Sequence, residues 1–330
     1  MHPLSHYLHP SYNHPTTRAW ISKLPSPSSL VYPIFVSDQP DELTPFKTMP
    51  EIYRFGYKKI VEHLVPLAKK GLKSILLFGI LSDSTTKDEV GSLGGGNGKD
   101  GPVHLALREI KKELPDLFVI CDVCLCEYTS HGHCCVFNSK DALDNDATLT
   151  RLVEMSISYI ENGANMVAPS DMMDGRIGAI KKAIRELGME IPVLAYSAKF
   201  SSSFYGPFRD VCQSAPQKGD RKGYQLPSDS KELALRAVQR DLEEGADFVM
   251  VKPITAYLDI ANEIKNKFNC ILACYHTSGE YSMVQFADKA GAVEKKKIML
   301  EYMRSFKRAG IDIIITYFTP DLLDWLREEQ

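Results

Sequence analysis

Short, continuous apolar runs alternate with longer amphipathic stretches along most of the chain. Continuous runs are typical of strands buried on both faces, whereas alternating runs indicate strands with one face in water. The pattern therefore predicts a parallel sheet covered by helices. The eight predicted strands are Tyr32–Val36, Ile75–Ile80, Val119–Leu125, Met166–Asp171, Val193–Lys199, Phe248–Pro253, Ile271–Ser278 and Ile313–Thr319.

The intervening stretches repeat apolar residues every three or four positions, which predicts amphipathic helices. Several end in a glycine that suits the left-handed position closing a helix. Strands and helices in alternation predict the α/β class and a closed (β/α)8 TIM barrel, with a doubly wound open sheet as the alternative. The clearest apolar stripes contain Leu149, Leu152, Val153, Ile157 and Ile160; Ile177, Ile180, Ile184 and Leu187; and Leu235, Val238 and Leu242, and the glycines are Gly71, Gly163, Gly188, Gly245 and Gly310.

The first residues stand apart from this pattern. Residues 1–25 contain four of the nine histidines, interspersed with prolines, and show no helical or strand period. We therefore expect an extended N-terminal arm, residues 1–25, followed by a single barrel domain, residues 26–330. A mobile arm is favoured over a dedicated histidine metal site.

Charge and composition exclude several functions. The 330 residues carry 39 Lys and Arg against 42 Asp and Glu, a net charge of −3, which gives no electrostatic case for nucleic acid or an anionic membrane. The apolar runs are too short to cross a bilayer. Residues 1–15 lack the features of a secretory signal, so we expect a cytosolic protein whose eight cysteines form no disulfide framework. The glycine-rich segment at residues 91–100 departs from a phosphate-binding loop at Leu93 and Asp100.

Two lysines end buried strands and give the strongest chemical signal. Lys199 closes the fifth predicted strand, and Lys252 comes near the end of the sixth. The carboxyl ends of barrel strands converge on the face that holds active sites. A buried lysine lowers its pKa and, once neutral, forms Schiff bases with ketones. The alternative is that each lysine pairs with a carboxylate such as Asp122 or Asp171.

Five cysteines fall between residues 121 and 135. Cys124, Cys126 and Cys134 offer three thiolates and leave a fourth position open, the pattern of a catalytic zinc site. A set of two cysteines with His131 or His133 is an alternative, as is a group of buried thiols without metal. The long segment Phe200–Gly223, which we call the lid, follows with its two arginines, and arginine binds carboxylates in bidentate fashion.

Six motifs, in order from about Tyr32 to the C-terminus, resemble the delta-aminolevulinic acid dehydratase (porphobilinogen synthase) family. These motifs combine the paired lysines with the cysteine segment, which makes a chance resemblance untenable. They are Cys121-Asp-Val-Cys-Leu-Cys-Glu-Tyr-Thr-Ser-His-Gly-His-Cys134, Ala168-Pro-Ser-Asp-Met-Met-Asp-Gly-Arg176, Tyr196-Ser-Ala-Lys-Phe200, Ser203-Phe-Tyr-Gly-Pro-Phe-Arg-Asp210, Met250-Val-Lys-Pro253 and Tyr275-His-Thr-Ser-Gly-Glu280.

The resemblance implies a lyase that condenses two 5-aminolevulinate molecules to porphobilinogen, with loss of two waters, in heme biosynthesis. It further implies an allosteric homo-octamer whose arms clasp neighbouring subunits. It assigns the first substrate's Schiff base to Lys252 and the second's to Lys199. The other implied residues are Ser278 and Tyr317 for the first carboxylate; Arg209, Arg221 and Gln225 for the second; Cys124, Cys126 and Cys134 for Zn²⁺; and Asp122 and Ser170 as further polar groups.

Three residues depart from the family pattern. Gly223 replaces a cysteine that joins a histidine in a second zinc site of some animal relatives, which makes that site doubtful here although His133 is present. Glu127 replaces a proline, and Cys135 replaces a glycine beside the last metal ligand. The rival functions are a class I aldolase, for which one lysine suffices, and a zinc-dependent scaffold without activity.

Overall fold

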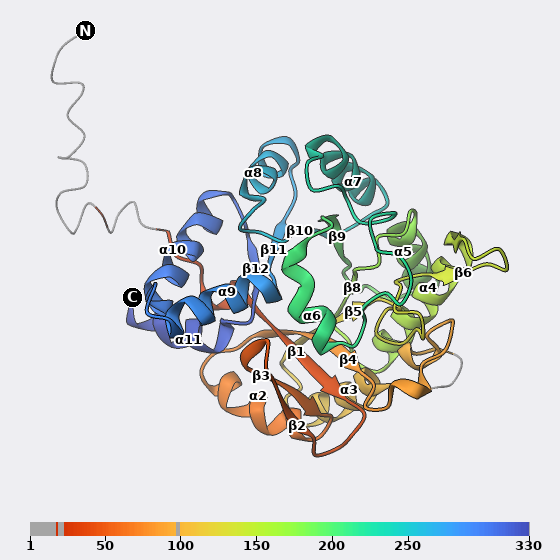
Figure 1. Cartoon of the computed structure of the whole chain (residues 1–330), viewed down its shortest axis with the longest axis horizontal. Coiled ribbons are helices and arrows are strands. Elements are labelled where there is room, and N and C mark those ends of the chain that lie inside the picture. The colour runs from red at the N-terminus through yellow and green to blue at the C-terminus, as the bar shows by residue number, and fades with distance from the viewer. Residues whose placement is uncertain (1–17, 19–22, 97–99, 330) are drawn as a thin grey trace, which may run out of the picture.

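The structure, a computed structural model, describes residues 18, 23–96 and 100–329. Parallel strands form a ring with helices around the outside, which confirms the predicted TIM barrel and excludes the open sheet (Figure 1). Each predicted apolar run overlaps one strand of this ring. In ring order the strands are β1 Leu30–Ser37, β4 Ser74–Ile80, β5 Phe118–Val123, β8 Met166–Pro169, β9 Leu194–Lys199, β10 Phe248–Lys252, β11 Leu272–His276 and β12 Ile313–Thr316.

The seam between β8 and β9 closes the ring with little main-chain pairing. A single parallel bridge joins Val167 to Val193, and the amide of Val167 donates to the carbonyl of Pro192 over 3.3 Å. Every other neighbouring pair of ring strands shares at least two register positions, and the β9–β10 pair contains a register shift between Val249 and Val251. Side chains beyond the strand ends therefore help to hold this seam together.

The helices cover the outer face of the ring, except α6, which lies over its end (Figure 1). The glycines predicted to close helices all have positive φ, between 68° and 103°, as the left-handed C′ position requires. The helices are α2 Lys59–Lys69, α3 Pro102–Glu113, α4 Asn145–Glu161, α5 Arg176–Glu186, α6 Gly206–Val211, α7 Lys231–Glu243, α8 Leu258–Lys267, α9 Ser278–Lys289, α10 Lys295–Arg308 and α11 Thr319–Glu328, with short 3₁₀ turns η3 Pro27–Ser29, η4 Ser84–Thr86, η5 Ser92–Gly94 and η6 Ser203–Tyr205.

Two short hairpins were not predicted. Strands β2 (Leu43–Phe46) and β3 (Met49–Gly56) pair with each other, and β3 also pairs with β1, while β6 (Val136–Phe137) and β7 (Leu143–Asp144) form a separate pair. These strands are partly exposed or only two residues long, so they lack the continuous apolar signal. Several predicted strands also extended too far, because their last residues lie in the turns that follow.

The division into an arm and a barrel stays a prediction, because residues 1–17 and 19–22 lie outside the described part of the chain. All eight cysteines are free thiols, as expected. Among the described residues, no helix combines the length and apolarity that crossing a bilayer requires.

Burial separates two leucines that can test this packing. Leu107 in α3 is fully buried, whereas Leu187, just after α5, is 50% exposed. Leu107→Ala should destabilise the fold by about 2–5 kcal/mol because it leaves a cavity. Leu187→Ala, the matched control, should cost about 0.5 kcal/mol or less. The midpoint of urea unfolding measures both, and equal shifts would contradict the packing described.

Candidate active site

Lys199 and Lys252 face each other on neighbouring strands. They are register partners in the pairing of β9 with β10, and both are 6% exposed. A register shift between Val249 and Val251 produces this pairing. Continued from Val249 opposite Ala195, an unbroken register would set Lys252 opposite Ala198. A one-residue offset places side chains on opposite faces, so the bulge brings both amines to one side of the sheet.

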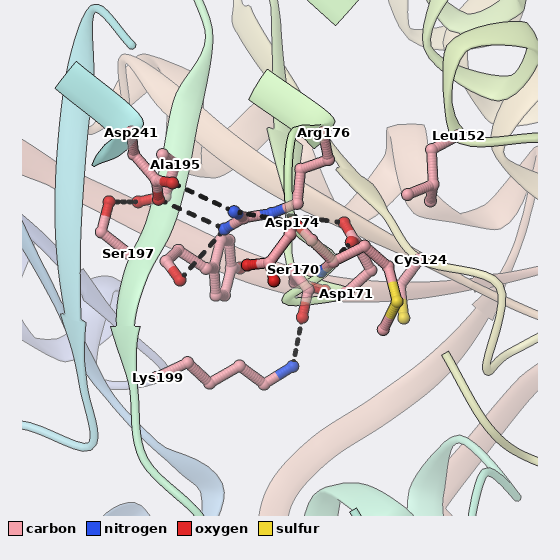
Figure 2. Close-up of polar contacts among 12 residues, drawn as sticks. Cys124, Leu152, Ser170, Asp171, Asp174, Arg176, Ala195, Ser197, Lys199 and Asp241 are labelled. Carbon is pink, nitrogen blue, oxygen red and sulfur yellow. Dashed lines mark hydrogen bonds and ion pairs between the residues drawn. The ribbon is translucent and has the colours of Figure 1, made fainter. Parts of the chain in front are cut away.

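Lys199 reaches across the thin seam to the end of β8. Its Nζ donates to the main-chain carbonyl of Ser170 over 2.5 Å (Figure 2). The Ser170 hydroxyl in turn donates to Asp122 Oδ2 over 3.0 Å. The predicted residues Lys199, Ser170 and Asp122 therefore form one connected group. Asp171 is turned elsewhere, toward Arg176, so it does not neutralise either lysine.

Lys252 is surrounded by aromatic rings. Its Nζ lies 4.1 Å from the centroid of Tyr275 and 5.3 Å from those of Tyr196, Tyr205 and Phe208. Burial lowers the pKa of Lys252 to about 7, the charge on Lys199 acts in the same direction, and Asp122 opposes it. A substantial fraction of Lys252 is thus a neutral, nucleophilic amine at neutral pH.

Ser278 and Tyr317 belong to the surroundings of Lys252. Ser278 Oγ accepts from the amide of Phe208 over 3.0 Å, and the hydroxyls of Tyr317 and Tyr275 are 2.9 Å apart. Phe208 and Tyr275 are two of the rings around the Lys252 amine. The predicted pair of hydroxyls therefore lies beside Lys252, as binding one substrate there would require.

Arg209, Arg221 and Gln225 come from the lid and the residues just after it. The amide of Leu226 donates to the carbonyl of Lys199 over 3.1 Å, which fixes Gln225 beside the end of β9. Within the described part of the chain, Arg209 Nε, Arg221 Nε and both amide atoms of Gln225 are buried without hydrogen-bond partners. Buried polar atoms normally have partners, so this grouping is typical of a site for a polar ligand.

The three predicted metal ligands are brought together. The sulfur atoms of Cys124, Cys126 and Cys134 lie within 4.8 Å of one another, and all three residues are buried. Tetrahedral zinc–thiolate bonds of 2.3 Å place sulfur atoms about 3.8 Å apart, so the cluster fits a zinc ion. Hydrogen bonds from the other two thiols lower the pKa of Cys134, which makes it the readiest of the three to ionise.

The histidine alternative is not supported by this geometry. His133 uses both ring nitrogens, with Nδ1 3.0 Å from the Tyr224 hydroxyl and Nε2 2.8 Å from the carbonyl of Lys218. Glu127 lies beside the cluster and is buried; it accepts from Cys126 Sγ over 3.5 Å, and burial raises its pKa to about 8. Cys135 is also fully buried and packs in the wall of the barrel.

Glu280 supports the site and was not recognised as important in the sequence. Its carboxylate is buried and accepts five hydrogen bonds of 2.5–3.1 Å from the turns after β10 and β11. The donors are the amides of Ile254, Thr255 and Thr277 and the hydroxyls of the two threonines. These turns follow Lys252 and precede Ser278, so one carboxylate fixes both.

A buried arginine gives similar support on the other side. Figure 2 shows the guanidinium of Arg176 between Asp171, which follows β8, and Asp241 in α7. All three side chains are fully buried, and Arg176 also contacts the carbonyl of Tyr196 in β9. Arg176 therefore ties the residues just after β8 and the middle of β9 to α7. Only its position in a family motif marked it in the sequence.

Together these features define an enzyme of the TIM-barrel class, with two buried lysines and a cluster of three buried thiols that could hold a metal ion at the carboxyl end of the strands. The profile of the family described as "Delta-aminolevulinic acid dehydratase" matches residues 6–325. The chain therefore belongs to this family, which confirms the predicted resemblance and the hydro-lyase class.

Known relatives agree with this assignment. The delta-aminolevulinic acid dehydratase of Bos taurus is 49% identical over 99% of this chain and 100% of the relative. The enzyme of Macaca fascicularis is 48% identical over 98% of each chain. A crystal structure of the Toxoplasma gondii enzyme in complex with its product porphobilinogen is 33% identical, with a TM-score of 0.94 over 99% of this chain and 93% of the other.

The role of the Glu280 carboxylate can be tested by a substitution that hardly changes the shape of the side chain. In Glu280→Gln, an amide nitrogen replaces one carboxylate oxygen, and each of these oxygens accepts at least two hydrogen bonds that the nitrogen cannot accept. Each lost buried bond costs about 1–3 kcal/mol, so we expect a lower unfolding midpoint and at least a tenfold loss in kcat/KM. Glu186→Gln, at a residue whose side chain is 65% exposed, is the matched control and should change neither. A Glu280→Gln protein that matches the native one in both measurements would show that the Glu280 carboxylate does not fix the turns after β10 and β11.

Proposed function

We propose that this chain condenses two molecules of 5-aminolevulinate to porphobilinogen, with loss of two waters, in the pathway to heme. The observation that carries the proposal is the register pairing of Lys199 with Lys252 in one buried mouth. Two amines at this spacing can hold two ketone substrates at once, whereas an aldolase needs only one. Two separate sets of polar groups, one beside each lysine, orient two identical molecules differently.

Lys252 holds the first substrate. Its neutral amine adds to the ketone carbon, and the adduct loses the former ketone oxygen as water to leave an imine. Protonation of the imine makes the neighbouring C–H bonds more acidic. The hydroxyls of Ser278 and Tyr317 bind the carboxylate of this molecule. The aromatic wall around Lys252 excludes water, and this burial lowers the pKa of the amine to about 7, so that a neutral fraction is present at neutral pH.

Lys199 holds the second substrate on the side of the lid. Arg209, Arg221 and Gln225 bind its carboxylate, because their unpartnered buried atoms are suited to an anionic ligand. Burial raises the pKa of Asp122 to about 6, and this carboxyl contacts the Ser170 hydroxyl. Asp122 and Ser170 can therefore move a proton beside both lysines.

Cys124, Cys126 and Cys134 hold Zn²⁺ in this proposal. When bound by these thiolates, the ion would supply Lewis-acid chemistry to an oxygen of the substrate. The same proposal places the protein in the cytosol as an allosteric homo-octamer in which the N-terminal arms clasp neighbouring subunits. Its support is the family resemblance together with the sequence of residues 1–25.

Borohydride trapping tests the roles of the two lysines. Reduction of the protein mixed with 5-aminolevulinate should leave a stable amine adduct on Lys252, because the imine becomes a C–N single bond. Lys199→Ala should still be trapped at Lys252 yet form no product, since the second ketone is not held. Lys252→Ala should lose both adduct and turnover.

Peptide mass mapping locates the adduct, and Lys182→Ala, at a lysine whose side chain is 76% exposed, is a matched control. An adduct on Lys199 alone would reverse the order of binding. Turnover without an adduct on either lysine would remove the Schiff-base mechanism.

Metal removal tests the thiol site. Excess chelator should abolish porphobilinogen formation, and added Zn²⁺ should restore it while the thiols remain reduced. Cys134→Ser should lower zinc affinity at least tenfold, as measured by competition with a chromophoric chelator. Cys270→Ser, outside the cluster, should leave zinc affinity unchanged. Full activity of metal-free protein would contradict a catalytic ion.

A further inference from the structure

The lid packs closely on the turn that precedes the third cysteine. The amide of Gln217 donates to the carbonyl of His131 over 3.1 Å, and Arg221 donates to the carbonyl of Gly132 over 2.9 Å. Gly132 has a φ of +70°, and a Cβ atom there would lie 2.5 Å from the carbonyl oxygen of Ala215. The main chain of the lid thus lies where any side chain at position 132 would have to be.

His133 and Tyr224 extend this contact as a chain of hydrogen bonds. Because the carbonyl of Lys218 can only accept, His133 Nε2 carries the hydrogen in their 2.8 Å contact. In the neutral ring, Nδ1 then accepts from the Tyr224 hydroxyl over 3.0 Å, and the Tyr224 oxygen accepts from the amide of Cys134 over 3.4 Å. The chain runs from the lid main chain to the main chain of a metal ligand.

Tyr224 also touches the metal site directly. Its ring packs against the cluster of Cys124, Cys126 and Cys134. In the sequence, Tyr224 lies between Arg221 and Gln225, two of the residues proposed to bind the carboxylate of the second substrate. A shift of the cysteine cluster therefore reaches the carboxylate-binding groups through a single side chain.

We propose that His133 and Tyr224 are positioning residues that fasten the lid to the cysteine cluster, so that a metal bound by the three thiols orders the lid and its two arginines. This inference rests on the proposed zinc site. Coupling of this kind is reciprocal: metal should strengthen binding of the second substrate's carboxylate, and the bound carboxylate should strengthen metal binding by the same factor.

Tryptic cleavage of the lid in the full chain provides the test. The side chains of Lys218 and Lys222 are 78% and 77% exposed, so both are accessible to trypsin once the main chain around them opens. In the native protein, Zn²⁺ should slow cleavage at these two lysines at least tenfold. Tyr224→Phe removes one hydroxyl and His133→Ala removes the imidazole, and each should lose most of this protection. Tyr302→Phe, in α10, is the matched control and should keep it.

Zinc affinity by chelator competition and steady-state kinetics are measured on the same proteins. Tyr224→Phe should raise KM for 5-aminolevulinate more than it lowers kcat, because the lid arginines are misplaced while the lysines are not. A native protein that binds no Zn²⁺ would overturn the metal assignment itself. Zinc binding without slower cleavage would overturn the coupling. Full protection in both Tyr224→Phe and His133→Ala would overturn their role as the fastening.

Discussion

The site depends on one constraint: two lysine side chains point from neighbouring strands into the same buried mouth. Two ammonium groups so placed repel each other, and each loses hydration, so the arrangement is costly while both are charged. The structure resolves this by giving the two amines different surroundings. Lys199 donates to the carbonyl of Ser170, whereas Lys252 is buried, and its loss of hydration favours the neutral form. Different functions for the two lysines follow from this difference.

The rest of the site keeps that arrangement from relaxing. The bulge in β10 sets the facing register, and Glu280 fixes the turns beyond β10 and β11 with five hydrogen bonds. On the opposite side, the buried Arg176 ties the residues just after β8 and the middle of β9 to α7, across the seam that a single main-chain bridge joins. The lid and the cysteine cluster then complete the mouth above Lys199. Side-chain networks thus stabilise the ring where main-chain pairing is weakest.

Much of the barrel could be predicted because its strands are buried on both faces and its helices close with glycine. Both properties leave strong local signals in the sequence. Once the strands were predicted, Lys199 and Lys252 could be placed at strand ends. The bulge between Val249 and Val251 leaves no such signal, so the sequence placed Lys199 and Lys252 at one face without showing that they are register partners.

Residues that act through tertiary contacts were missed or misplaced for a similar reason. Asp171 ends a predicted strand like a mouth residue, yet it turns back to a buried arginine. Glu280 stands in the first turn of a helix, where an acidic residue is ordinary, and its five donors come from residues up to 26 positions away. The two histidines of the cysteine segment matched metal spacing as well as the cysteines did. Only folding shows that Lys218 of the lid and Tyr224 just after it occupy the two ring nitrogens of His133.

The most direct measurement is the pKa of the Lys252 amine itself, obtained by competitive labelling of lysines across pH with mass mapping of each site. We expect half-maximal labelling of Lys252 near its pKa of about 7, well below the value of about 10.4 for a free lysine side chain. Lys199→Met should raise the pKa of Lys252 by removing a like charge, and Asp122→Asn should lower it by removing an opposite one. A Lys252 that titrates near the value of free lysine, unchanged in both variants, would contradict the account.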